Sequence, residues 1–354
     1  MSADRPITTP ESPIIEPPII ESPIARLGRL TDLATPFAVR TLATLRIPDL
    51  IASGITGLDE LATAAGADSD ALGRLLRYLA HRDVLTEPAP GVFALTDIGE
   101  QLRDHGPGGQ RGWLDLDGLG ARMDLAYAGL PHSIRTGKPA YETVHGRDYW
   151  AELDARPQLR AYFDALMLSQ QHLTAPQVAA LYDWTTAEHV FDVGGGSGEL
   201  LIRVLTTHPH LRGTFVDRPI AAAAVTGRLA DAGLADRATA VTGDFFAPLP
   251  PGGDVYVVSR ALTDWSDADA TTILRRCAAA AGTGGRVLIV EVLPTEPHVP
   301  HLAPFDLQML VTVGGRERGL DDFRGLAAAA GLGVATVLHG RDGLVLIECV
   351  PAGA

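Results

Sequence analysis

Cysteine is scarce in this sequence, and no long apolar run is present. The two cysteines, Cys277 and Cys349, are too few for a disulfide framework and lack metal-ligand spacing, so we expect both in the core. No cluster of metal ligands is visible, and we expect no metal site. No stretch approaches the roughly 18 apolar residues of a membrane helix, and the first residues lack the pattern of a signal peptide. These absences predict a cytoplasmic protein without membrane contact.

Basic residues are also scarce. The formal net charge is -14 and the sequence pI is about 5.2, which argues against a polyanionic partner. Residues 25–105 contain eight arginines, no lysine and eleven acidic residues. A segment with that balance lacks the attraction for phosphates that nucleic-acid binding requires. We therefore expect no nucleic-acid partner.

The chain has 354 residues, which is long enough for more than one domain. Residues 1–24 repeat proline and isoleucine ("ESPIIEPPIIESPI"), a pattern that bars a regular helix and predicts an extended tail, or a docking peptide. Residues 25–108 show helical spacing followed by a hairpin pattern, the order of a winged helix. Given its acidic balance, this segment is predicted to be a dimerisation domain. Residues 109–181 are predicted to be helical and to contribute to a substrate pocket.

Residues 182–354 differ, because short apolar runs alternate with helical segments. The runs include "HVFDV", "GTFVD", "DVYVVSRAL" and "RVLIVEVLP". Such alternation indicates a parallel sheet with crossover helices. The final segment, "VATVLHGRDGLVLIECV", is split at a turn and predicts an antiparallel hairpin at the sheet edge. The predicted fold is an α/β Rossmann-like domain joined to a mainly helical winged-helix domain.

The stretch "FDVGGGSGEL" places glycines directly after an apolar strand and before a helix. Gly194, Gly196 and Gly198 would let the backbone turn sharply and approach a ligand closely. A dinucleotide fingerprint needs glycine at the position that Glu199 holds, so a dinucleotide is disfavoured. The observed spacing, D-x-G-x-G-x-G, instead matches a loop that binds S-adenosylmethionine (SAM).

Two later strand ends support the same ligand. "TFVD" ends in Asp217, whose carboxylate can accept hydrogen bonds from both hydroxyls of a ribose. "TGDFF" places Asp244 and Phe245 after the next strand, where the acid could accept from an adenine amine and the ring could lie against the base. The alternative roles are a helix cap for Asp217 and a core position for Phe245.

Together these motifs resemble those of the plant-type small-molecule O-methyltransferases, and most closely their actinobacterial relatives that tailor aromatic polyketides. The resemblance covers roughly residues 25–352 and includes "TGKPAYETVHGRDYWAELDARP", "DWSDADATTILRRC" and "GGRERGL". It implies a homodimer held by the winged-helix region and a SAM-dependent methyltransferase domain. By position, the implied SAM contacts are Arg160, Met167, Gly194, Gly196, Asp217, Asp244, Phe245 and Ser259.

The resemblance also contains one departure. Plant-type members have a histidine base where this sequence has Thr263, and a threonine hydroxyl cannot accept a proton near neutral pH. The implied catalytic residues are Asp264, Glu291 and Glu317, and the implied acceptor pocket includes Asp264, His301 and Met309. His301 is also a candidate substitute base. Since "LTDW" holds no ordinary base, we expect transfer to depend on proximity and orientation.

Three functions are compatible with this sequence. The first, which is the predicted function, is SAM-dependent methylation of a hydroxyl on an aromatic or polyketide-type secondary metabolite. The second is a SAM-retaining enzyme that hydroxylates, decarboxylates or cyclises such a substrate, because Thr263 replaces the usual base. The third, a winged-helix regulator that senses SAM, conflicts with the acidic N-terminal region.

Overall fold

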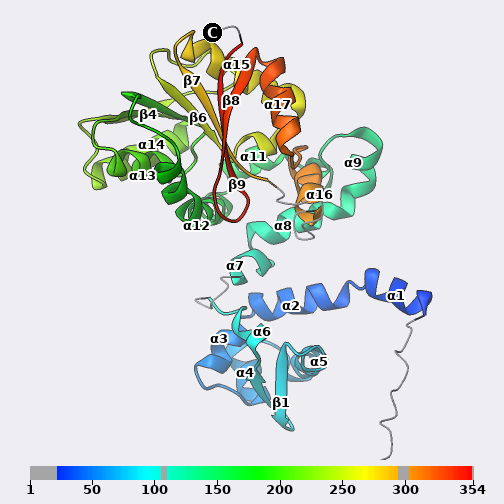
Figure 1. Cartoon of the computed structure of the whole chain (residues 1–354). Coiled ribbons are helices and arrows are strands. Elements are labelled where there is room, and N and C mark those ends of the chain that lie inside the picture. The colour runs from blue at the N-terminus through cyan, green and yellow to red at the C-terminus, as the bar shows by residue number, and fades with distance from the viewer. Residues whose placement is uncertain (1–21, 105–109, 294–302, 353–354) are drawn as a thin grey trace, which may run out of the picture. The chain divides into compact units, whose positions relative to one another are not determined.

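The computed structural model describes residues 22–104, 110–293 and 303–352, and the chain divides into two compact units, residues 1–111 and 112–354. Each unit has its own buried residues. Figure 1 shows the helices and strands of the whole chain. Nearly all of the predicted tail, residues 1–21, lies outside the described residues. The finer domain boundaries at residues 24, 108 and 181 stay predictions.

The first unit is helical with one small hairpin. Its elements are α1 (Pro23–Leu30), α2 (Ala34–Thr44), α3 (Ile47–Ala52), α4 (Leu58–Ala65), α5 (Ser69–Ala80), β1 (Leu85–Ala89), β2 (Val92–Leu95) and α6 (Asp97–Glu100). Asp68 caps α5, since its carboxylate accepts from the Ala71 amide at 2.9 Å. The hairpin turns at Gly91, whose φ of +74° favours glycine. This is the predicted element order of a winged helix.

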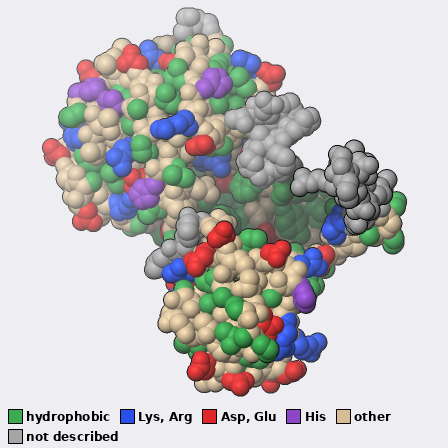
Figure 2. Space-filling model, turned by 60° about the horizontal axis from the view of Figure 1, so that its bottom comes forward, with side chains coloured by type: hydrophobic (Ala, Val, Ile, Leu, Met, Phe, Trp, Pro, Cys, Tyr) green, Lys and Arg blue, Asp and Glu red, His purple; other side chains and the backbone are tan. Residues whose placement is uncertain are grey.

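Large apolar side chains of α1 and of the start of α2 lie outside the core of the first unit. The exposed ones are Ile24, Leu27, Leu30, Leu33 and Phe37, and α1 has no buried residue. Several exposed large apolar side chains on one short segment are typical of a protein–protein interface and fit the predicted dimerisation role. On the face seen in Figure 2, basic side chains stand among acidic and apolar ones rather than in one continuous area.

The second unit has a helical part that forms one wall of the pocket described below. Its elements are α7 (Arg111–Leu114), α8 (Leu119–Leu125), η1 (Ala126–Gly129), α9 (Leu130–Thr136), α10 (Tyr141–His145), α11 (Tyr149–Ala155), α12 (Pro157–Leu181) and α16 (Ala303–Thr312). They share an apolar core in which Tyr149 packs edge-on against Tyr141 and Trp150, with ring centroids 5.3 and 5.0 Å apart. The predicted helical character of this segment is confirmed.

The rest of the second unit is built on a seven-stranded sheet of order β5-β4-β3-β6-β7-β9-β8 (Figure 1). Its strands are β3 (His189–Val193), β4 (Arg212–Asp217), β5 (Ala238–Thr242), β6 (Val255–Ser259), β7 (Arg286–Val292), β8 (Leu332–His339) and β9 (Leu344–Pro351). The first five are parallel, and the β8–β9 hairpin is antiparallel and lies at the edge. The predicted parallel sheet and edge hairpin are both confirmed.

Helices cover both faces of the sheet, which explains why β6 is buried along its whole length. They are α13 (Glu199–Thr207) and α14 (Pro219–Asp231), which join α12 on one core, and α15 (Asp267–Ala281) and α17 (Leu320–Ala329), which form the other. Cys277 and Cys349 are free and buried in the second of these cores, as predicted. The strand order reverses between β3 and β6, and ligands of such sheets bind at the carboxyl ends beside that point.

Within the described residues, no helix combines the length and apolar character needed to cross a membrane.

Candidate active site

The glycine-rich loop connects β3 to α13 at the reversal point of the sheet. Gly194, Gly196 and Gly198 have φ values of +69°, +59° and +72°, a left-handed backbone that side chains other than glycine adopt at a cost. A Cβ on Gly194 would lie 2.9 Å from the Phe245 ring, whereas one on Gly196 would meet nothing within 4 Å. The loop therefore leaves open space on one side, as close approach to a ligand requires.

Asp217 ends β4 directly beside this loop. Its carboxylate accepts hydrogen bonds from the Gly196 amide at 2.9 Å and from the Arg218 amide at 2.7 Å. Burial raises the pKa of Asp217, and the two amide bonds oppose that increase. The carboxylate is thus fixed at the loop, where it can accept from the hydroxyls of a ribose. This position agrees with the role predicted from the sequence.

Asp244 and Phe245 follow β5, the strand that pairs with β4 in the sheet. The Phe245 ring lies against Gly194 and packs edge-on against Phe246 and Trp265, with centroid separations of 5.1 and 5.7 Å. Asp244 is exposed, and its carboxylate accepts from the Phe246 amide at 2.9 Å. A flat ring beside the glycine loop and an adjacent acceptor fit an adenine, as predicted.

The remaining predicted SAM contacts lie around this loop. Ser259 is buried at the end of β6, and Met167 on α12 lines the pocket described below. Arg160 is also on α12, where its guanidinium donates to Asp164 at 2.9 Å and lies 3.7 Å from Asp154. A guanidinium has five N–H donors, so Arg160 can keep both partners and still donate to a methionine carboxylate.

Two further residues of the loop region were not predicted to have a role. Gln171 on α12 donates to the Gly195 carbonyl at 3.3 Å and accepts from the Ser197 hydroxyl, so it ties the loop to the helix. Asp192, the acid of the D-x-G-x-G-x-G pattern, is buried beneath Gly195, and neither of its carboxylate oxygens has a hydrogen-bond partner among the described residues. Burial, and then the charge of Asp217, raise the pKa of Asp192 to about 7.

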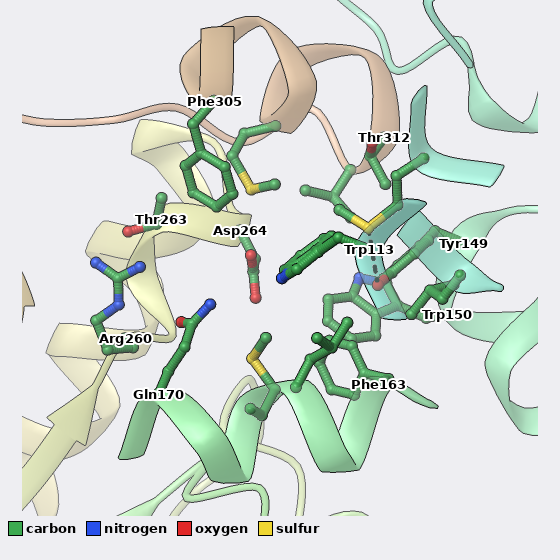
Figure 3. Close-up of a pocket in the computed structure, with 16 residues that line it drawn as sticks. Trp113, Tyr149, Trp150, Phe163, Gln170, Arg260, Thr263, Asp264, Phe305 and Thr312 are labelled. Carbon is green, nitrogen blue, oxygen red and sulfur yellow. Dashed lines mark hydrogen bonds between the residues drawn. The ribbon is translucent and has the colours of Figure 1, made fainter. Parts of the chain in front are cut away.

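Next to the loop, the second unit contains a cavity that is open to solvent on one side (Figure 3). Its wall is mostly apolar and aromatic, formed by Trp113, Leu119, Met123, Tyr149, Trp150, Phe163, Leu166, Met167, Phe305, Met309 and Val313. Five polar side chains complete it, namely Gln170, Arg260, Thr263, Asp264 and Thr312. A mostly apolar wall with a few converging polar groups is the usual form of a site for a flat aromatic ligand.

Thr263 lies in η2 (Leu262–Asp264), at the predicted position. Its hydroxyl donates to Oε2 of Glu291 at 3.2 Å, and both side chains are buried. Oε1 of Glu291 has no hydrogen-bond partner among the described residues. Burial raises the pKa of Glu291 to about 7, against the opposing charge of Arg260. Thr263 is therefore a hydrogen-bond donor to a carboxyl group, and that it does not act as a base stays a prediction.

Asp264 points toward the middle of the labelled side chains in Figure 3. Burial and the negative charges of Glu291 and Glu317, opposed by the positive charge of Arg260, together raise the pKa of Asp264 to about 7. Burial raises the pKa of Glu317 as well. From the sequence, an ordinary aspartate with a pKa near 4 is a poor proton acceptor for a phenol. In this structure, burial raises the pKa of Asp264 above that ordinary value.

The segment "GGRERGL" holds η2 in place. The Arg316 amide donates to the Thr263 carbonyl at 2.9 Å, and a Cβ on Gly315 would lie 2.1 Å from that same oxygen. The buried guanidinium of Arg318 donates to the Leu262 and Trp265 carbonyls, each at 2.7 Å, and to the Asp267 carboxylate. These hydrogen bonds from Arg316 and Arg318 fix the backbone of the short stretch that carries Thr263 and Asp264.

Of the two further residues predicted to line the acceptor pocket, Met309 does so from α16. His301 lies outside the described residues. Arg260, in contrast, lines the pocket but was not predicted from the sequence. It directly follows the strand β6, which is the one signal that could have drawn attention to it.

A Rossmann-like domain with a glycine loop, an acid at the end of the neighbouring strand and an aromatic pocket is the arrangement of a class I, SAM-dependent methyltransferase with a small-molecule acceptor. The chain belongs to the O-methyltransferase family, because the O-methyltransferase domain model matches residues 127–333, more than half of the chain. The O-methyltransferase dimerisation domain matches residues 29–103, in agreement with the predicted homodimer.

Individual relatives are similar over nearly the whole chain. A 2,7-dihydroxy-5-methyl-1-naphthoate 7-O-methyltransferase from Streptomyces carzinostaticus is 48% identical over 308 residues, 87% of this chain and 92% of the relative. Aclacinomycin 10-hydroxylase RdmB from Streptomyces purpurascens is 42% identical over 315 residues, 88% of this chain and 84% of the relative. Among solved structures, the O-methyltransferase NcsB1 from neocarzinostatin biosynthesis, in complex with SAM and 2-hydroxy-5-methyl naphthoic acid, has a TM-score of 0.86 at 46% identity, covering 92% of this chain and 98% of that one.

Proposed function

We propose that this enzyme methylates a phenolic hydroxyl of a two- or three-ring aromatic metabolite, with Asp264 as the proton acceptor. The observation that carries the proposal is the position of Asp264, a carboxylate of raised pKa inside an aromatic pocket beside the SAM loop. The relative from Streptomyces carzinostaticus is named as a methyltransferase of a dihydroxylated naphthoate, which is a flat acceptor of the same class. The pocket wall of Trp113, Trp150 and Phe163 suits such a ring system.

The cofactor would be held by Asp217, the glycine loop and Phe245, with Asp244, Ser259, Met167 and Arg160 as the further proposed contacts. SAM, when bound, supplies an electrophilic methyl group. The glycine conformations and the open space at Gly196 fit this ligand. The dependence on SAM also supports the cytoplasmic location predicted from the sequence.

The protein has two tasks at the acceptor. The first is orientation: the aromatic wall holds the ring so that its hydroxyl faces the cofactor site, and positioning of this kind can contribute about 7–11 kcal/mol to lowering the barrier. The second is removal of the proton. A simple phenol with a pKa of about 10 is ionised only to about one part in a thousand at pH 7. The ionised Asp264 carboxylate can accept its proton, and general-base assistance typically contributes about 10²–10⁴-fold.

Glu291 and Glu317 support Asp264 rather than contact the acceptor. Neither lines the pocket, and their negative charges raise the pKa of Asp264. Thr263 donates to Glu291 and so favours the ionised form of that carboxyl group. We therefore assign Asp264 the catalytic role and the two glutamates positioning and electrostatic roles.

The test uses SAM with a deuterated methyl group and a set of hydroxynaphthalenes and hydroxynaphthoates, with mass spectrometry of the product. We expect a product that carries the label on oxygen. A second candidate, hydroxylation, is favoured by the similarity to aclacinomycin 10-hydroxylase and by the absence of the usual histidine. An unlabelled product that has gained oxygen would support hydroxylation and contradict methyl transfer.

A further inference from the structure

Arg260 has a backbone conformation that is unusual for a residue with a side chain. It follows β6 directly, and its φ of +54° lies in the left-handed region. Such a conformation is strained for a residue with a side chain and is retained where the surrounding structure fixes it. Here the Arg260 amide donates to the Val290 carbonyl at 2.9 Å, and the side chain extends into the pocket wall (Figure 3).

The guanidinium of Arg260 has unused hydrogen-bond donors. Its side chain is 24% exposed, yet among the described residues no hydrogen bond to it occurs. The nearest ion-pair contact runs from Nη1 to Oε2 of Glu291 at 3.6 Å, beyond hydrogen-bond distance. That oxygen already accepts from Thr263. The positive charge of Arg260 is therefore partly balanced by Glu291, while its guanidinium lines the cavity without a hydrogen-bond partner in the part of the chain that the structure describes.

The surroundings of Arg260 make this feature specific. Among the described residues of the pocket wall, Arg260 alone carries a positive charge. Arginines nearby in the fold are engaged elsewhere, since Arg318 binds Asp267 and Arg160 binds Asp164. A planar guanidinium in a mostly apolar pocket matches a carboxylate, which it can bind through two parallel hydrogen bonds.

We propose that Arg260 binds an anionic oxygen group, best matched by a carboxylate, that the aromatic acceptor carries next to its reacting hydroxyl. Arg260 and Asp264 then act on neighbouring substituents of one ring: Arg260 orients the anion and Asp264 receives the proton. The site accordingly selects hydroxylated aromatic acids over plain phenols. This inference rests on the proposed function and adds the substrate class and the residue that selects it.

The experiment measures binding by calorimetry in the presence of S-adenosylhomocysteine, so that no transfer takes place. The ligands are 1-hydroxy-2-naphthoate and 1-naphthol, which differ by one carboxylate. The proteins are the wild type, Arg260→Gln, Arg260→Lys and, as a control, Arg324→Gln. Arg324 lies on α17, where it pairs with the exposed Asp321, so its removal changes the net charge equally without touching the pocket.

We expect the wild type and Arg324→Gln to bind the acid about 10- to 100-fold more tightly than 1-naphthol, the range for a charge-assisted pair. In Arg260→Gln this preference should disappear while the Kd of 1-naphthol stays unchanged, and Arg260→Lys should keep part of it. Equal Kd values for both ligands in the wild type would overturn the proposal without the use of any variant. So would an Arg260→Gln protein that folds normally but loses affinity for both ligands equally, or for S-adenosylhomocysteine itself.

These outcomes are separate from those of the labelling experiment. A labelled product from 1-naphthol and from 1-hydroxy-2-naphthoate at equal kcat/KM supports methyl transfer and contradicts the role of Arg260. Tight, Arg260-dependent binding of the acid together with an unlabelled, oxygenated product supports the role of Arg260 and contradicts methyl transfer.

Discussion

Thr263 occupies the position of the family's histidine base, and its replacement by alanine separates a structural role from a catalytic one. The substitution removes one buried hydrogen bond, from Oγ1 to Oε2 of Glu291 at 3.2 Å. It leaves that carboxyl group without its donor, so we expect a loss of about 1–2 kcal/mol in the free energy of unfolding. Because the hydroxyl accepts no proton from the substrate, kcat should fall less than about tenfold, well below the 10²–10⁴-fold of a lost base.

The assay for Thr263→Ala combines urea unfolding with single-turnover transfer from labelled SAM. Thr263→Ser is the matched control, because it keeps the hydroxyl donor and removes only a methyl group. It should recover most of the lost stability. A Thr263→Ala enzyme that folds and binds SAM normally but loses three orders of magnitude in kcat would refute the purely structural role that we assign to Thr263.

Three further substitutions test the cofactor site and the support of η2. Asp217→Asn should raise the Kd of SAM about 10- to 100-fold in calorimetry, because a charge-assisted contact is lost; an unchanged Kd would remove Asp217 from the site. Gly315→Ala should lower both stability and kcat, since the new Cβ would lie 2.1 Å from the Thr263 carbonyl; a variant with wild-type Tm and rate would contradict this packing. The pKa of Asp192 in the folded state is raised to about 7. Between about pH 4 and pH 7 the folded state therefore keeps a proton that the unfolded state releases, so the free energy of unfolding falls as the pH rises through this range. The Tm of Asp192→Asn relative to wild type, measured without SAM, should therefore increase between pH 5 and pH 8, and a constant difference would speak against the raised pKa.

Much of the fold could be predicted because its signals are local. Apolar runs alternating with helical segments gave the parallel sheet, and the turn "GRDG" gave the β8–β9 hairpin. Glycines at fixed spacing after a strand gave the loop, since the left-handed φ of Gly194 and Gly196 favours glycine. The position of Asp217 could also be predicted from a local signal, because Asp217 ends an apolar strand, and that strand pairs with β3.

The properties of the acceptor site depend on tertiary contacts that the sequence does not display. The pKa of Asp264 is raised by burial and by Glu291 and Glu317, which lie on distant segments of the chain. No local sequence pattern predicts the left-handed backbone conformation of Arg260. Arg260 places a positive charge in the mostly apolar wall of the pocket. Gln171, in the middle of a long helix, reaches the glycine loop only because α12 packs against α13.

The central claim is that Asp264 accepts the proton of the reacting hydroxyl, and the pH dependence of Asp264→Asn tests it most directly. The measurement is the single-turnover rate of label transfer to the accepted phenol between pH 5 and pH 10, for the variant and the wild type. The carboxylate acts as a base only when ionised, so the wild-type rate should rise with pH to about 7 and then level off. In Asp264→Asn the rise of the rate up to about pH 7 should be absent. The rate at pH 7 should be about 10²–10⁴-fold lower than in the wild type, and it should rise only as the phenol ionises, with a pKa near 10. A variant that binds SAM and the phenol normally and keeps the wild-type rate and pH profile would contradict the claim.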